Sequence, residues 1–212
     1  MNTPTRVVVL VSGRGSNLRS IIAARDSGQL SITIPVVISN NPGAAGLDYA
    51  RAAEIPTAVV DHREFPKRAD FDRALAREID RHQPDLVVLA GFMRILGAEF
   101  IRRYQGRLMN IHPSLLPALT GLDTHARAIQ GGHREHGATV HFVVEEVDAG
   151  PIIVQAAVPV FADDTPETLA TRVLREEHRI YPQAIRWFAE GRLTIEAGHV
   201  LLDGQPVAAQ GR

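Results

Sequence analysis

The stretch VVVLVSGRGSNL, residues 7–18, decides the fold class. Its first five residues are apolar and end at Val11, and a turn with Gly13 and Gly15 follows. A short apolar run without polar alternation is typical of a strand that is covered on both faces, as in a parallel sheet. The residues from Ser16 to about Ser27 have helical spacing and are closed by a glycine. The stretch therefore predicts a buried strand, a glycine turn and a helix.

Strand and helix patterns keep alternating to about residue 110. Strand patterns cover residues 34–40, 57–61 and 85–92, and helical patterns cover residues 43–53, 68–82 and 98–104. Beyond them, residues 138–146 and 151–160 resemble a hairpin, and a long helix is expected from Thr165 to about Glu190. The sequence therefore predicts an α/β fold with a doubly wound, mostly parallel, Rossmann-like sheet and an appended C-terminal β-hairpin and long helix. We expect one domain over residues 1–212.

The composition of the chain argues against several classes of function. The chain has 212 residues, a net charge of -1 and no cysteine. The charge gives no general attraction to nucleic acid or to an anionic membrane, so neither is an expected partner. Without cysteine there is no disulfide framework and no thiolate chemistry. The first apolar run is too short for a signal peptide or a spanning helix, and the cytoplasm is the expected compartment.

The glycine turn favours an anion, but not a dinucleotide. The amides of Gly15, Ser16 and Asn17 are expected at a helix N-terminus, where negative charge is favoured. Leu18 stands where the third glycine of G-x-G-x-x-G is required, and the second strand ends in Asn40-Asn41 without an acid for a ribose. No Lys-Ser/Thr follows for a Walker motif. A single phosphate monoester is more plausible, and a simple capped strand-helix turn is the alternative.

Polar residues also cluster at the end of a later strand, in RLMNIHPSLLP (residues 107–117). Asn110 and His112 share one face because they are two residues apart in a strand. An amide and an imidazolium are two donors for an oxyanion, and a histidine can also move a proton. Asp148, in the turn EEVDAGP, could orient His112. The alternatives are a structural role for His112 at the end of a strand and ordinary turn chemistry for Asp148, which precedes a small residue and a glycine. Ser114 is formally a candidate nucleophile, but it lies only two residues past His112, which makes the required hydrogen bond awkward.

Other polar residues carry weaker signals. His133 and His136 are three residues apart, but no carboxylate pattern accompanies them, so we interpret GGHREHG as a polar loop and expect no metal. Arg68 is most simply a solvated helix residue.

Taken together, the motifs VVVLVSGRGSNL, VVLAGFMRIL, NIHPSLLP, HGATVHFVVEEVDAGPII and REEHRIYP resemble those of the phosphoribosylglycinamide formyltransferase family of purine biosynthesis. The resemblance covers nearly the whole chain in order. It implies transfer of a formyl group from 10-formyltetrahydrofolate, a co-substrate, to the amine of 5'-phosphoribosylglycinamide. That substrate carries one phosphate monoester, in agreement with the glycine turn.

The resemblance also implies roles for particular residues. Asn110 and His112 would stabilise a tetrahedral intermediate with support from Asp148. About residues 1–110 would form the phosphate-binding half, and about residues 111–212 the catalytic and folate side. Substrate would bind at Gly15, Ser16, Asn17, Leu174, Arg175, Glu176 and Glu177. The folate would bind at Arg68, Met93, Arg94, Ile95, Leu96, Val144, Glu145, Glu146 and Val147.

Departures and rival functions follow from the same comparison with the family. Arg14, Thr120 and Asp123 stand where the family usually has a smaller polar residue, a proline and a histidine. Rival functions are a formyltetrahydrofolate hydrolase or another formyltransferase, such as the one acting on initiator methionyl-tRNA. Both usually carry an extra domain. A rival from a different class is a non-catalytic folate- or nucleotide-binding module. The sequence does not predict the oligomeric state.

Overall fold

The computed structural model describes residues 3–207, and the chain divides into two compact units after Met109. The first unit contains a parallel sheet with the strand order β4-β3-β1-β5, and β2 also pairs with β1. Its strands are β1 (Thr5–Val11), β2 (Ile32–Thr33), β3 (Val37–Ser39), β4 (Thr57–Val59) and β5 (Leu86–Leu89). Its helices are α1 (Ser16–Asp26), α2 (Gly46–Ala52), α3 (Arg68–Asp80) and α4 (Ala98–Arg103), with a 3-10 turn η1 (His62–Glu64).

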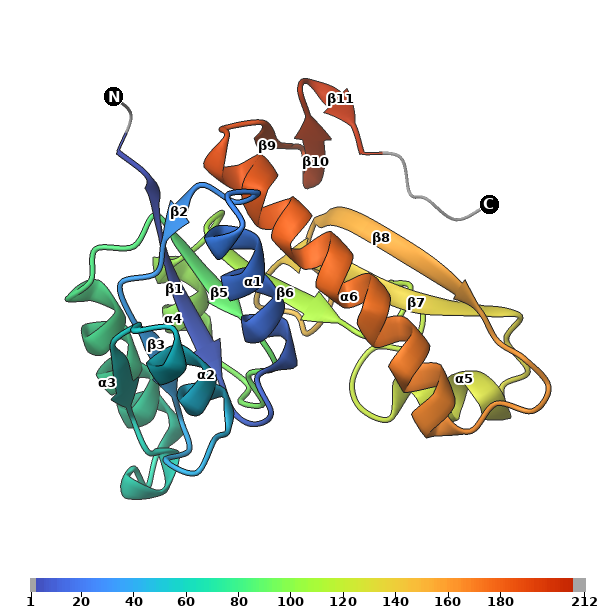
Figure 1. The fold of residues 1–212 in the computed structure, drawn as a ribbon, viewed down its shortest axis with the longest axis horizontal. Helices are drawn as coiled ribbons and strands as arrows, with labels where there is room; N and C mark the ends of the chain where they lie inside the picture. The colour runs from blue at the N-terminus through green and yellow to red at the C-terminus, as the bar shows by residue number, and fades with distance from the viewer. Residues whose placement is uncertain (1–2, 208–212) are drawn as a thin grey trace. The chain divides into compact units, whose positions relative to one another are not determined.

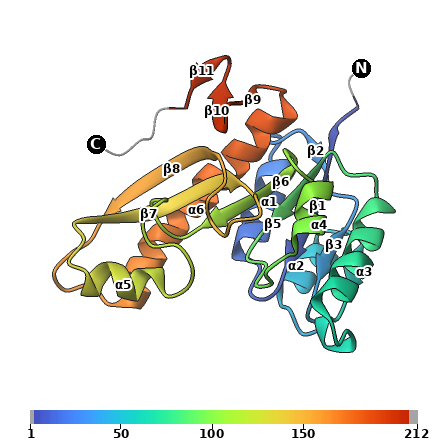
Figure 2. The same cartoon turned by 180° about the vertical axis from the view of Figure 1, so that it is seen from behind.

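Strand β1 is a central strand of this sheet and is buried for that reason. Residues Val7 to Val11 are fully buried, and β1 pairs with β3 on one side and with β5 on the other. Helices α1 and α2 contact each other, as do α3 and α4 (Figures 1 and 2). A strand with helices against both faces has no exposed side, so all five buried positions, Val7–Val11, are apolar.

The second unit is built on an antiparallel hairpin and one long helix. Its strands include β6 (Leu108–His112), which begins with the last residues of the first unit, and its sheet order is β6-β7-β8. β7 (Glu135–Phe142) and β8 (Ile152–Pro159) pair antiparallel, with a bulge between Val140 and His141. The other elements are α5 (Thr124–Gln130), α6 (Pro166–Ala189), β9 (Leu193–Glu196), β10 (His199–Leu202) and β11 (Gln205–Pro206).

Helix α6 lies along the β7–β8 hairpin, as both ribbon views show (Figures 1 and 2). It begins where the sequence predicts. Thr165 accepts from the backbone N–H of Thr168, Thr168 accepts from the backbone N–H of Thr165, and Pro166 occupies the first helical position. This reciprocal cap satisfies donors that a helix start would otherwise leave unpaired.

The structure confirms the predicted fold class: a mostly parallel, Rossmann-like α/β sheet with an antiparallel hairpin and a long helix. Several boundaries differ. The first hairpin strand ends at Phe142, and residues 143–146, predicted as strand, belong to the connection that carries Asp148 at a φ of 56°. Helix α5 and strand β2 were not predicted. The sequence pattern missed both because they are short and have little periodicity.

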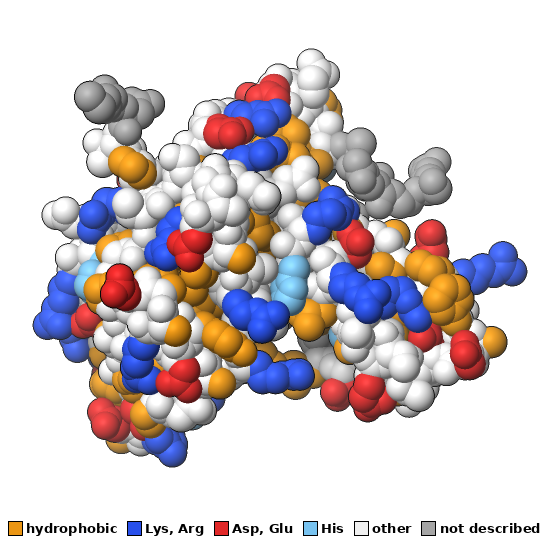
Figure 3. Space-filling model, in the orientation of Figure 1, with side chains coloured by type: hydrophobic (Ala, Val, Ile, Leu, Met, Phe, Trp, Pro, Cys, Tyr) orange, Lys and Arg blue, Asp and Glu red, His pale blue; other side chains and the backbone are white. Residues whose placement is uncertain are grey.

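The surface is mixed in charge. On the face shown in Figure 3, basic and acidic side chains are interspersed, as expected for a net charge of -1. Among residues 3–207, no helix is both long enough and apolar enough to cross a membrane.

Candidate active site

The glycine turn of the first unit is shaped by close packing against α2. Gly15 has a φ of 73°, and a Cβ added there would lie 2.4 Å from the Cα of Gly46. The N–H of Gly46 in turn donates to the carbonyl of Gly13 at 2.9 Å. A side chain at position 15 would therefore be strained and would also collide with backbone. This turn places the first residues of α1 directly after β1.

The start of α1 offers backbone donors. Gly15 caps the helix without a side-chain hydrogen bond, and the first intrahelical bond runs from the N–H of Arg19 to the carbonyl of Gly15. The amides of Ser16 and Asn17 precede that bond and have no acceptor within the helix. The predicted phosphate-binding residues thus lie together in the first unit, at a helix end that favours an anion.

Ser12 joins three segments at the carboxyl ends of the parallel strands. Its hydroxyl donates to Oδ1 of Asn40, after β3, at 2.5 Å. The hydroxyl oxygen of Ser12 also accepts from the N–H of Met93, after β5, at 2.8 Å. The sequence pattern alone does not indicate this role of Ser12. In open α/β sheets, this edge is where ligands bind.

The predicted folate segment Met93–Leu96 is anchored at both ends. Besides the Met93–Ser12 bond, the N–H of Gly97 donates to Oδ2 of the buried Asp72 at 2.8 Å. Between the anchors, Met93 is 68% exposed and Ile95 65%, whereas Leu96 is buried. Exposed apolar side chains on an anchored loop are suited to an apolar ligand.

Arg68 lies at the same end of the loop. It begins α3 and lines a cavity of about 400 Å³ with Asp72 and Gly97. Burial raises the pKa of Asp72, and the nearby charges of Arg68 and Arg94 partly oppose this rise. The structure therefore brings Arg68 and the Met93–Leu96 segment together through Asp72.

In the second unit, Asn110, His112 and Asp148 form one cluster. Nδ1 of His112 lies 3.5 Å from Oδ2 of Asp148. That oxygen also accepts from the N–H of Gly121 at 2.9 Å. The other nitrogen of His112, Nε2, lies 3.0 Å from the carbonyl oxygen of Leu119. Asp148 thus lies beside the histidine despite being 36 positions further along the chain.

His141 also belongs to this cluster and is not among the residues predicted from the sequence. Its Nε2 lies 3.2 Å from Nδ2 of Asn110 and 4.0 Å from Oδ1 of Asp148. Its Nδ1 lies 3.0 Å from the carbonyl oxygen of Phe142. Its place near the end of the strand that leads to the Asp148 turn was a signal that could have found it.

Ser114 is not a nucleophile in this arrangement. It is fully buried, and its hydroxyl donates to the carbonyl of Ala118 at 2.7 Å. Its own carbonyl accepts from the hydroxyl of Thr139 at 2.7 Å, and that hydroxyl also accepts from the N–H of Leu116 at 3.0 Å. Ser114 and Thr139 therefore hold the loop that follows His112.

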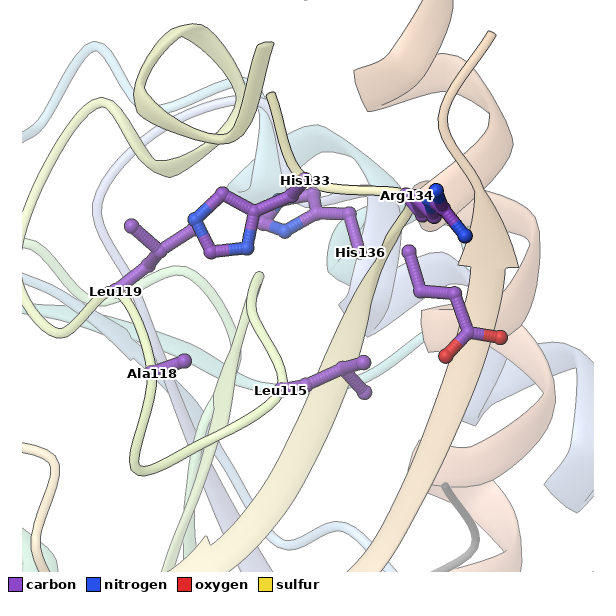
Figure 4. A pocket seen from close by; sticks show the side chains of 7 residues that line it. Leu115, Ala118, Leu119, His133, Arg134 and His136 are labelled. Carbon is purple, nitrogen blue, oxygen red and sulfur yellow. The ribbon is translucent and has the colours of Figure 1, made fainter. Parts of the chain in front are cut away.

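The interpretation of His136 as part of a polar loop is wrong. His136 lies in β7, is buried, and its Nε2 lies 3.2 Å from Nδ1 of His125. Burial, together with the nearby His125 and other histidines, lowers the pKa of His136 to about 4. His133 and His136 line a cavity of about 320 Å³, facing Leu115 and Ala118 (Figure 4). Among residues 3–207, no group of three or more His, Cys, Asp or Glu side chains is arranged to hold a metal.

The remaining predicted contact residues lie on α6 and on the β7–β8 connection of the second unit. Glu177 is buried, Leu174 and Glu176 are half-buried, and Arg175 is exposed. Glu176 pairs with Arg179 at 2.7 Å. On the connection, Val147 is exposed together with Glu145 and Glu146, and Val144 is half-buried.

Comparisons with known proteins converge on one family. A model of the formyl transferase family matches residues 5–185. Phosphoribosylglycinamide formyltransferase of Escherichia coli K12 is 50% identical over 205 residues, covering 97% of each chain. The solved structure of phosphoribosylglycinamide formyltransferase from Coxiella burnetii is 52% identical, with a TM-score of 0.93 and 99% of each chain covered. A formyltetrahydrofolate deformylase from Pseudomonas putida KT2440 is 29% identical, with a TM-score of 0.86, covering 95% of this chain and 71% of that one.

Proposed function

The chain belongs to the formyl transferase family, and we propose that it transfers the formyl group of 10-formyltetrahydrofolate to the amine of 5'-phosphoribosylglycinamide. The observation that carries the proposal is the cluster of Asn110, His112 and Asp148 in a chain that matches such formyltransferases over nearly its whole length. An amide and an imidazole beside a carboxylate suit acyl transfer, where negative charge develops on a carbonyl oxygen.

In the proposed reaction, the substrate amine attacks the formyl carbon, and a new C–N bond forms. The bond from that carbon to the folate nitrogen then breaks, and the proton lost by the amine replaces the formyl group on the folate. Asn110 and His112 donate to the oxygen of the tetrahedral intermediate, and Asp148 orients the imidazole and stabilises its charged form. Because Nε2 of His112 is already 3.0 Å from the Leu119 carbonyl, His112 must exchange that acceptor for the formyl oxygen.

The binding assignments rest on the resemblance and on local features of each unit. We assign the substrate phosphate to the amides of Gly15, Ser16 and Asn17, since they lie at the N-terminus of α1, where an anion is favoured. Met93–Leu96, with Arg68 beside it, and Val144–Val147 are assigned to the folate, whose pterin needs apolar contacts and backbone hydrogen bonds. Leu174–Glu177 is assigned to the substrate, with the buried Glu177 as its main polar contact.

A formyl-transfer assay tests the proposal. Purified protein, 10-formyltetrahydrofolate and 5'-phosphoribosylglycinamide are mixed, and matched reactions omit the amine or use His112→Ala. We expect loss of the folate's formyl group only when the amine is present. Removing one oxyanion donor typically lowers the rate by about 10²–10³, so His112→Ala should be nearly inactive. Near-full turnover by a folded His112→Ala would overturn the assignment of His112.

Hydrolysis of formyltetrahydrofolate is the second candidate, because the Pseudomonas putida deformylase shares the fold with 29% identity. The same assay separates the two functions. Loss of the formyl group at an unchanged rate without the amine would favour hydrolysis. Absence of both reactions from a folded protein would favour a binding module or another amine acceptor.

A further inference from the structure

His141 is held in one orientation by the strand that carries it. It is 2% exposed and lies at the bulge of β7, where its Nδ1 is 3.0 Å from the carbonyl oxygen of Phe142. A carbonyl oxygen can only accept a hydrogen bond, so Nδ1 must carry the proton. In a neutral imidazole, Nε2 is then an acceptor.

That acceptor faces the Asn110 side chain. Nε2 of His141 is 3.2 Å from Nδ2 of Asn110, so the amide nitrogen donates one of its two N–H groups to His141. The second N–H of the same nitrogen is left for another acceptor. If the amide were turned over, its oxygen would face the lone pair of Nε2, which is repulsive.

We infer that His141 is a positioning residue that determines which way the Asn110 carboxamide faces, and so keeps an N–H available for the formyl oxygen. This inference rests on the proposed function for its kinetic consequence, but not for its structural content. A reversed amide would present Oδ1 instead of N–H to an oxygen that becomes negative in the intermediate, which would slow the transfer.

The charges around His141 favour the neutral ring that this role requires. Asp148, on the β7–β8 connection, has Oδ1 4.0 Å from Nε2, and His112, on β6, is the other titratable group that influences its charge. Burial lowers the pKa of His141 and outweighs the opposing effects of the Phe142 carbonyl and the Asp148 carboxylate. A proton on Nε2 would replace the acceptor with a donor and would force the amide to turn.

The tautomer is the first test, because it does not depend on activity. The protein is labelled with ¹⁵N-histidine, and the two ring nitrogens of His141 are assigned at pH 7 by comparison with His141→Gln. We expect Nδ1 to carry the proton and Nε2 to have the shift of an unprotonated nitrogen. A proton on Nε2 would overturn the inference, whatever the protein catalyses.

A pair of variants is the second test. His141→Gln places an amide oxygen near the position of Nε2, whereas His141→Leu removes the acceptor. We expect His141→Leu to lower kcat by about 10- to 100-fold, as misplacement of a reacting group by about 1 Å can do. KM for both substrates should change by less than about threefold, since this interaction is used in the intermediate. His141→Gln should recover most of kcat.

The controls separate this inference from the proposed function. His199→Gln changes an exposed histidine on β10 and should leave kcat unchanged. Wild-type kcat in His141→Leu, or an equal loss of kcat in folded Leu and Gln variants, would contradict the positioning role. If the wild-type protein transferred no formyl group, the proposed function would fail, while the tautomer measurement would still decide how His141 holds Asn110. If His141→Leu does not fold, the tautomer and kcat of His141→Gln decide the question.

Discussion

Replacement of Asp148 by asparagine tests the proposed mechanism most directly. The two side chains have nearly the same shape, so the amide oxygen can still accept from the N–H of Gly121, which now donates to Asp148 at 2.9 Å. The change removes the negative charge that lies 3.5 Å from Nδ1 of His112. It therefore isolates the charge of Asp148 from its role in holding the turn.

The separation of the two groups sets the expected magnitude. Opposite unit charges about 3.5 Å apart attract each other by about 5 kcal/mol at an effective dielectric constant of about 20. The side chains of His112 and Asp148 are 7% and 11% exposed, so solvent screens the pair only partly. The neutral amide keeps part of the interaction, and we expect a loss of about 2–4 kcal/mol in the intermediate. At 1.36 kcal/mol per factor of ten, kcat should fall by about 30- to 1000-fold.

The assay is steady-state formyl transfer, with kcat and both KM values measured separately. The fall should be in kcat, because Asp148 supports the imidazole that donates to the oxygen of the intermediate. Asp163→Asn is the matched control, since Asp163 is an exposed carboxylate of the same unit. Far-UV circular dichroism and a thermal melt check that each variant folds. If folded Asp148→Asn keeps kcat within about threefold of wild type, the charge of Asp148 has no part in the reaction.

Two further predictions concern stability. Gly15→Ala should lower the free energy of unfolding by about 2–5 kcal/mol, because it adds left-handed strain and a Cβ 2.4 Å from the Gly46 Cα. Gly13→Ala is the control, since a Cβ at position 13 would have open space around it. Equal thermal melts for the two variants would refute the packing argument. His136 has a pKa of about 4 in the fold against 6.5 in the unfolded chain, so only the unfolded chain gains a proton as the pH falls below 6.5. The contribution of His136 to the free energy of unfolding should therefore be constant above pH 6.5 and fall between pH 6.5 and 4, by about 2 kcal/mol at pH 5. Urea unfolding at pH 7 and pH 5 measures this loss, and His136→Gln should lose less; an equal loss would exclude His136 as its cause.

The sequence predicted those features that depend on neighbours along the chain. The apolar run Val7–Val11 and its glycine turn indicated a buried parallel strand followed by a helix, and the structure has β1 and α1 there. Thr165 and Pro166 indicated the start of the long helix for the same reason, since capping is a local interaction. Short elements without periodicity, such as α5, were missed, and residues 143–146 were wrongly assigned to a strand.

In the candidate site, too, the sequence predicted the local features and missed the contacts between residues far apart in the chain. The positions of Asn110 and His112 on one strand face followed from their spacing of two residues. The sequence did not indicate that His141 holds the Asn110 amide, that Asp72 accepts from Gly97, or that His136 is buried against His125.

By itself, therefore, the sequence determined the fold class, the glycine turn and the polar residues at a strand end, because periodicity and turn chemistry act over a few residues. Only the tertiary structure decided the partners of those residues. Asn110 and His141 are separated by 31 positions, and Asp72 and Gly97 by 25. Which of two distant side chains meet depends on strand register and packing, and a one-residue change of register would turn every side chain of a strand to its other face.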